Sequence, residues 1–316
     1  MVKTELTHQT WGPWPTVRLA TAAVAVEVAG EVGARVISLM DLRREREWMV
    51  QGEPPTELEQ MAWAEEGAPF GPRESFGWDE CLPTTLTCAD PLDASAPGLR
   101  DHGDQWGRGA YLSADPDAGA LVHTWSVPRW PYRLSRRLSY EDERTLLAEY
   151  VLTSHAEVAL PIHWAQHALF ELEDGAAIDL PEVSRVRPSA SIGIELPDEI
   201  DWPVATLADG AKVDFRCIAR GLEWATVVYA EPGEDVRMVQ PDGARLDLDW
   251  DREFAPALRV WLSNSGWSTG GPPNVQYGME PVTSADDDLG AAIERERARM
   301  LQPGEAVHWW VRMRLS

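Results

Sequence analysis

Histidine and glutamate residues stand where acid–base chemistry could take place. His163 and His167 lie four residues apart within residues 160–172, which read LPIHWAQHALFEL, and Glu280 interrupts a later apolar run. A histidine can donate or accept a proton near neutral pH, because its ordinary pKa is close to 6.5. A glutamate in an apolar run is unfavourable unless it is paired or faces a cleft, and desolvation raises its pKa. His167 and Glu280 are therefore candidates for a general acid and a general base.

Each of these two residues also has a purely structural interpretation. Residues 160–172 alternate like a strand whose phase slips near Gln166, so His167 and Gln166 lie on opposite faces unless a bulge intervenes. His167 could be a hydrogen-bonded histidine of the core, and Glu280 a carboxylate on an edge strand. The functional interpretation is a strand whose polar positions line a cleft.

A glycine-bracketed turn at residues 99–110, LRDHGDQWGRGA, carries a further histidine. His102 is followed there by Trp106 and Arg108. The segment is too polar for the interior of a strand and too aromatic for an ordinary surface loop. Loops held on a rigid scaffold often carry binding groups, so this turn could hydrogen-bond a polyhydroxylated ligand. The alternative is an exposed loop with an incidental histidine.

Residues 51–85 read as a long irregular segment that contains one short helix, at residues 57–65. The segment ends in FGWDECLPTT, which includes Trp78, Asp79 and Glu80. Loops of this length in a compact domain are usually functional or disordered. The sequence leaves open an ordered loop over a binding site or a solvated acidic turn.

Composition excludes several classes of partner. The 52 acidic and 28 basic residues give a net charge of −24, which argues against binding to nucleic acid or to an anionic membrane surface. Three cysteines without a close pair argue against a disulfide framework and a structural zinc site. The first residues form no apolar signal segment and no run of about 18 apolar residues occurs. We therefore expect a cytoplasmic protein without a membrane-spanning helix.

The chain contains 16 tryptophans, which is several times the ordinary frequency. Most must lie in the core, but some could line a groove, where an indole ring packs against the C–H face of a sugar. We expect at least one of Trp78, Trp106 and Trp164 to line the cleft.

Strand patterns predominate along the chain and predict an all-β fold. Residues 181–203 read instead as a polar loop, and residues 289–300 as a helix capped by the aspartates at 286–288. The number of strands favours a large antiparallel β-sandwich, and we expect one domain over residues 1–316. The predicted strands cover residues 17–19, 23–28, 34–42, 47–50, 120–127, 132–140, 145–153, 177–180, 212–219, 224–230, 237–239, 244–250, 257–262 and 306–315.

Three stretches in a fixed order resemble the galactose mutarotase-like, or aldose 1-epimerase, superfamily, in particular its poorly characterised bacterial branch. They are DHGDQWGR around His102, QHALF around His167 and GMEP around Glu280. GARVISLMDLRREREW near the start and LQPGEAVHWWVRMRL at the end are also similar to its first and closing strands. The resemblance implies a supersandwich fold with few short helices, whose concave face binds a sugar.

The resemblance also implies roles for individual residues. His167 matches the general acid that protonates the ring oxygen, Glu280 the base that takes the proton of the anomeric hydroxyl, and His102 the histidine that orients the sugar. Gln166 stands where better-studied relatives often have asparagine, and their further substrate-binding aspartate has no clear counterpart. Neither a metal nor another cofactor is implied. The predicted contacts with the sugar come from His102, Arg108, Trp106, Gln166, Trp78, Asp79 and Trp164.

These expectations lead to one preferred function and two alternatives. The preferred function is an isomerase, an aldose 1-epimerase that interconverts the α and β anomers of a small sugar, as a monomer or a homodimer. One alternative is a sugar-binding protein of the same fold without catalysis. The other is a lyase or glycosidase, for which the pair of carboxylates would be Asp79 or Glu80 together with Glu280.

Overall fold

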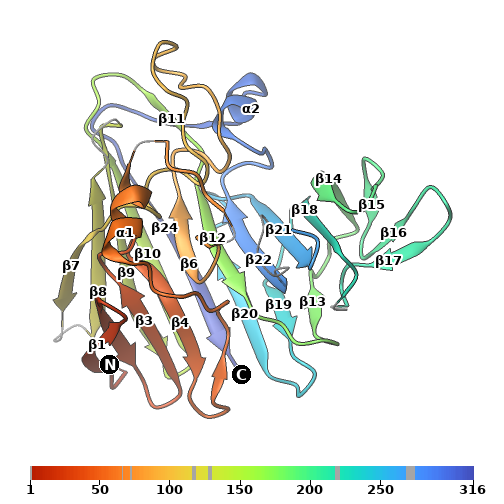
Figure 1. Cartoon of the computed structure of the whole chain (residues 1–316), viewed down its shortest axis with the longest axis horizontal. Coiled ribbons are helices and arrows are strands. Elements are labelled where there is room, and N and C mark those ends of the chain that lie inside the picture. Colours follow the sequence, from red (N-terminus) through yellow and green to blue (C-terminus); the bar gives the residue numbers. More distant parts are fainter. Residues whose placement is uncertain are drawn as a thin grey trace.

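The computed structural model describes residues 2–65, 67–71, 73–115, 119–126, 130–217, 221–267 and 275–316. Two antiparallel sheets pack against each other over these ranges (Figure 1), and a continuous hydrophobic core fills the space between them. The predicted all-β class and the large antiparallel sandwich are therefore confirmed.

The larger sheet carries the segments that the sequence singled out for chemistry. Its centre runs in the order β4, β6, β12, β22, β21 and β18, so residues far apart in the sequence become neighbours. The bounds of its strands, among the described residues, are β1 Glu5–Trp11, β2 Trp14–Ala20, β3 Val24–Ala29, β4 Arg35–Asp41, β5 Arg46–Glu47, β6 Trp78–Cys81, β12 Ala165–Phe170, β22 Val275–Val282, β21 Ala257–Asn264, β18 Trp224–Ala230, β14 Arg185–Ile192 and β15 Ile200–Asp201.

The smaller sheet closes the other side of the core. Its strands, in spatial order, are β13 Ala177–Asp179, β19 Val236–Val239, β20 Arg245–Trp250, β24 Ala306–Leu315, β10 Thr145–Ser154, β9 Tyr132–Asp142, β8 Ala120–Ser126 and β7 Tyr111–Asp115. Two further pairs join β11 Leu160–Ile162 to β23 Arg299–Leu301 and β16 Val204–Thr206 to β17 Lys212–Asp214. The helices are α1 Glu57–Ala64 and α2 Leu289–Glu294. Within the described ranges, no helix is long and apolar enough to cross a membrane.

Alternation of apolar side chains explains the strands that the sequence predicted most accurately. In β24, Val307, Trp309 and Val311 face the core, while the residues between them face outward. Trp309 lies between two other aromatic rings, with ring centroids 3.9 Å from Phe254 and 5.0 Å from Tyr150. Strands with this pattern form because one face of the sheet is buried.

A charged cluster lies within the apolar core and joins the two sheets. The Glu80 carboxylate of β6 accepts hydrogen bonds from the Trp78 indole (3.0 Å), the Arg136 guanidinium (3.0 Å), the Tyr150 hydroxyl (2.9 Å) and the Trp164 indole (3.0 Å). Burial raises the pKa of Glu80 to about 7, although Arg136 and these hydrogen bonds favour the ionised form. Two of the donors, Arg136 on β9 and Tyr150 on β10, thereby fix β6 against the opposite sheet.

Several predicted elements need correction. Residues 181–203 were expected to be a loop but contain β14 and β15, whose exposed side chains hide the alternation. The strand predicted at 212–219 ends at Asp214, and its last two residues, 218 and 219, lie outside the described ranges. The predicted helix at 289–300 ends at Glu294 because Glu296 adopts a left-handed conformation (φ +57°), after which the chain enters β23. Residues 78–81 form the buried strand β6 rather than part of a loop.

Candidate functional site

Two adjacent strands of the large sheet place His167 and Asp79 on the same face. β6 and β12 are antiparallel neighbours, and their register sets Asp79 opposite His167 and Glu80 opposite Gln166. Because side chains alternate across a sheet, Asp79 and His167 point away from the core while Glu80 and Gln166 point into it. This pairing thus places His167 and Gln166 on opposite faces of the sheet, as the alternation in the sequence predicts.

His102 reaches the same region from the turn at residues 99–110. Its backbone N–H donates to the carbonyl of Thr85 (2.9 Å), and the N–H of Asp104 donates to the carbonyl of Leu82 (3.1 Å). His102 itself has a left-handed backbone (φ +59°). This conformation is uncommon for residues with a side chain, and such strain is concentrated at functional sites.

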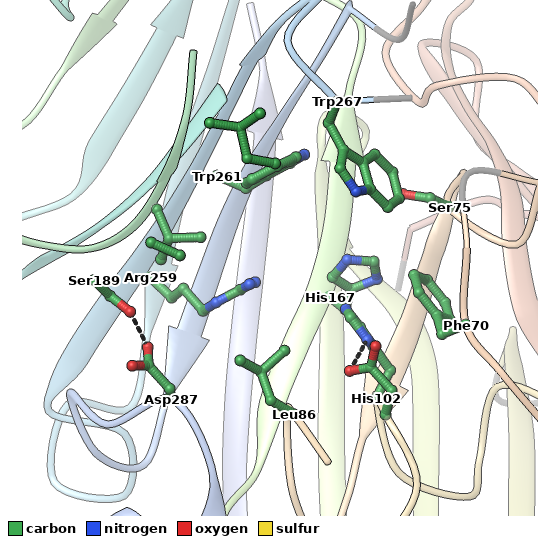
Figure 2. A pocket seen from close by; sticks show the side chains of 14 residues that line it. Phe70, Ser75, Leu86, His102, His167, Ser189, Arg259, Trp261, Trp267 and Asp287 are labelled. Carbon is green, nitrogen blue, oxygen red and sulfur yellow. Dashed lines mark hydrogen bonds and ion pairs between the residues drawn. The ribbon is translucent and has the colours of Figure 1, made fainter. Parts of the chain in front are cut away.

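The two histidines line one cavity of about 200 Å³ on the outer face of the large sheet. Their ring centroids are 4.6 Å apart, and the Phe70 ring stacks on His102 at 3.8 Å. Figure 2 shows His167 and Arg259 approaching the cavity from opposite sides, with Trp261 and Trp267 at one end and Leu86 at the other. The described lining residues are Phe70, Ser75, Leu86, Asp101, His102, His167, Ser189, Ala190, Ile192, Val227, Arg259, Trp261, Trp267 and Asp287.

A carboxylate holds each histidine by its Nδ1 atom. Asp79 Oδ1 lies 2.9 Å from Nδ1 of His167, and Asp101 Oδ1 lies 3.0 Å from Nδ1 of His102. Burial opposes ionisation of Asp79, but the nearby Arg35 guanidinium and His167 outweigh it and lower the pKa of Asp79 below its usual value. Burial and the neighbouring His167 lower the pKa of His102, against the effect of Asp101. His102 is therefore neutral near pH 7, with Nε2 as a proton acceptor.

Glu280 lies next to the cavity but does not line it. It sits opposite Arg259 in the register of β21 and β22 and is fully buried, with its Oε2 bonded 2.5 Å from the Arg259 guanidinium. Its other oxygen, Oε1, has no hydrogen-bond partner among the described residues. A Cβ atom on Gly278 would collide with Oε1 and lie 3.0 Å from Cβ of Trp261, a cavity residue. The absent side chain at Gly278 thus lets Oε1 lie close against the backbone of β22, beside Trp261.

The structure does not support several predicted sugar contacts. Trp78, Trp164 and Gln166 point into the core, where the two indoles bind Glu80 and Gln166 approaches Tyr150. Trp106, the third tryptophan named in the prediction, is fully buried and does not line the cavity either. The expectation that at least one of these three tryptophans lines the cleft is therefore wrong.

Two further predicted contacts lie just outside the cavity. Asp79 is fully buried and reaches it only through His167. Arg108 is absent from the described lining and lies 4.0 Å from Asp104. A glycosidase requires a pair of carboxyl groups that both reach the sugar. Glu80 faces the core, and Asp79 is bonded to Arg35 and His167. Neither residue therefore forms such a pair with Glu280.

Sequence reasoning missed the residues that form the rest of the cavity wall. Arg259 and Trp261 alternate within the predicted strand at residues 257–262, and an arginine in this mostly apolar strand was an available signal. The aspartates at 286–288 are predicted to cap α2, and Asp288 does so by accepting from the N–H of Ala291 (2.8 Å). Asp287 instead accepts from the hydroxyl of Ser189 and lines the cavity (Figure 2).

No protein-family model and no curated protein matches the sequence. Solved structures do match over nearly the whole chain. A galactose mutarotase-like protein from Clostridium acetobutylicum aligns with 100% of this chain and 98% of its own, at 11% identity and a TM-score of 0.65. A galactose mutarotase-like protein from Lactobacillus casei aligns with 99% of this chain and 100% of its own, at 14% identity and a TM-score of 0.63. A galactose mutarotase related enzyme from Lactobacillus acidophilus, at 13% identity, covers 99% of this chain and 97% of its own with a TM-score of 0.58. The chain therefore has the galactose mutarotase-like fold.

Proposed function

We propose that the protein is an aldose 1-epimerase that interconverts the anomers of a small sugar. The observation that carries this proposal is the cavity in which His102 and His167, both held by Nδ1, lie beside the Arg259–Glu280 pair. Its volume of about 200 Å³ is below the range of 300–1,000 Å³ typical for drug-sized ligands. The volume favours a single sugar ring over a chain of sugars.

The proposed reaction needs one base and one acid. Glu280 takes the proton of the anomeric hydroxyl, the oxygen forms a carbonyl with C1, and the bond between C1 and the ring oxygen breaks. His167 delivers a proton from Nε2 to the ring oxygen as it leaves. The open-chain aldehyde then rotates about its C1–C2 bond and closes on the other face by the reverse transfers. Each well-placed proton transfer contributes about 10²–10⁴-fold to the rate.

The unpartnered Oε1 supports the assignment of Glu280 as the base. A buried carboxylate oxygen without a donor is unfavourable, and the hydroxyl of a bound sugar would provide one. Arg259 holds the other oxygen and thereby fixes the orientation of the carboxylate. His102, with an acceptor nitrogen towards the cavity, would bind a second hydroxyl.

Anomer exchange measured by saturation-transfer NMR tests the proposed function. We expect the wild-type protein to accelerate exchange for at least one member of a panel of aldoses, relative to buffer and to His167→Ala. Line broadening on binding without acceleration for any sugar would contradict the isomerase and favour the sugar-binding alternative.

Gly278→Ala is expected to displace the Glu280 carboxylate, because the new Cβ and Oε1 cannot occupy the same space. Overpacking of this kind costs about 1–3 kcal/mol of stability, and we expect anomer exchange to fall at least tenfold in protein that remains folded. The matched control is Gly30→Ala, whose Cβ would lie 3.5 Å from Leu112 in ordinary contact. Equal exchange rates in the two variants, measured by NMR beside thermal unfolding curves, would show that exchange does not depend on the position of the Glu280 carboxylate.

A further inference from the structure

We propose that Arg35 and Asp79 are positioning residues that hold the proton of His167 on Nδ1 and so direct its Nε2 to the sugar. The inference deepens the proposed function and rests on it for the role of His167. The geometry itself involves three side chains from three neighbouring strands, β4, β6 and β12.

The three side chains form a continuous buried chain. Arg35 Nη2 lies 2.6 Å from Asp79 Oδ2, and Asp79 Oδ1 lies 2.9 Å from His167 Nδ1. Arg35 and Asp79 have no exposed side-chain surface, and His167 has 3%. His167 is the member that reaches the cavity.

Arg35 is itself held in place by the segment that precedes β6. Its guanidinium donates to the carbonyls of Glu74 and Phe76, the latter at 3.0 Å, and packs over the Phe76 ring at 4.3 Å. Because these contacts fix Arg35, they also fix the Asp79 carboxylate. The orientation of His167 is therefore set by Asp79 and Arg35, neither of which lines the cavity.

The ionisation of Asp79 determines which nitrogen of His167 carries hydrogen. An ionised carboxylate only accepts hydrogen bonds, so Nδ1 of His167 must carry the hydrogen. Nε2 then accepts a proton in the neutral ring and donates one in the imidazolium. Both directions of the proposed transfer thus take place at the nitrogen that faces the cavity. Arg35 keeps Asp79 ionised, so that the proton stays on the histidine.

An asparagine at position 79 would remove this control. Its amide nitrogen can donate to Nδ1, which would favour the tautomer with hydrogen on Nε2. That tautomer offers no acceptor to the cavity, and in serine proteases the corresponding change lowers turnover by about 10⁴-fold. We expect Asp79→Asn to lower the maximal rate of anomer exchange by about 10²–10⁴-fold, with little change in the sugar concentration for half-maximal rate.

The test combines that rate with ¹⁵N NMR of labelled histidine, in which the two ring nitrogens of each tautomer have distinct chemical shifts. The spectra are recorded for wild-type protein without sugar at pH 7.5, and the His167 signals are assigned by comparison with His167→Gln. We expect the neutral form of His167 to carry its hydrogen on Nδ1. In Asp79→Asn we expect it on Nε2. The matched control is Asp41→Asn, which replaces another buried aspartate paired with an arginine, on β4. It should change neither the tautomer nor the rate.

Each result decides the proposal separately from the proposed function. Hydrogen on Nε2 in the wild type, or an unchanged tautomer in Asp79→Asn, would overturn it. If Asp79→Asn does not fold, the wild-type spectrum still decides. If the wild-type protein accelerates exchange for no sugar but shows the Nδ1 tautomer, the proposed function fails while the positioning of His167 stands.

Discussion

Replacement of Glu280 by glutamine is expected to slow the catalysed anomer exchange by about 10²–10⁴-fold and to leave sugar affinity nearly unchanged. Glutamine has the shape of glutamate, and its amide oxygen can still accept from Arg259, which lies opposite it in the sheet. It cannot take a proton from an anomeric hydroxyl. Saturation-transfer NMR gives the exchange rate, and sugar titration followed by line broadening gives the affinity.

Stability must be measured beside activity for this variant. Arg259 is 7% exposed, and glutamine removes the carboxylate that is ion-paired with its guanidinium, so some loss of stability is expected. The control is Glu157→Gln at an exposed position, which should match the wild type in every assay. Exchange at the wild-type rate in folded Glu280→Gln would exclude Glu280 as the base. Attention would then move to the groups that line the cavity, His102 first, since its Nε2 is an acceptor.

The position of His102 beside His167 shows which part of the site could be predicted from the sequence. The two residues are 65 positions apart, and their pairing was expected only from the resemblance of three ordered motifs, not from any local pattern. The structure brings their ring centroids to 4.6 Å in one cavity. Local patterns could indicate a strand for His167 and a turn for His102, but the contact between them depends on how β6 and β12 pair and on how the turn is anchored to residues 82–85.

The tryptophans show where the sequence was misleading. Trp78 and Asp79 are adjacent, so if one faces the cavity side the other must face the core once the segment is a strand. Interpreting residues 78–80 as a loop removed that constraint and allowed both Trp78 and Asp79 to be assigned to the binding site. Arg259 was missed for a different reason. Its partner Glu280 lies on the next strand, and cross-strand pairing is not visible in the periodicity of either strand alone.

The charged cluster in the core is a second feature that depends on long-range pairing. Glu80 and Arg136 lie on opposite sheets, 56 positions apart in the sequence, and both are fully buried. Breaking a buried ion pair by removing one partner destabilises a protein by about 3–5 kcal/mol, because the other charge remains uncompensated. Each hydrogen-bond donor left without an acceptor adds about 1–3 kcal/mol.

Glu80→Leu is therefore expected to lower the free energy of unfolding by at least 3–5 kcal/mol, roughly the cost of one broken buried ion pair. The reason is that the variant loses the acceptor shared by Arg136, Tyr150 and two indoles. Chemical unfolding at pH 8, above the pKa of about 7 to which burial raises Glu80, measures the effect with the carboxylate ionised. The matched control is Glu149→Leu, which removes the partner of Arg137 at a site where the two side chains are 47% and 37% exposed. That exposed pair contributes about 0–1 kcal/mol. If both variants lost the same small amount, the cluster would not be what holds β6 to the opposite sheet, and the position of Asp79 and His167 on the outer face would have to be maintained by the apolar core alone.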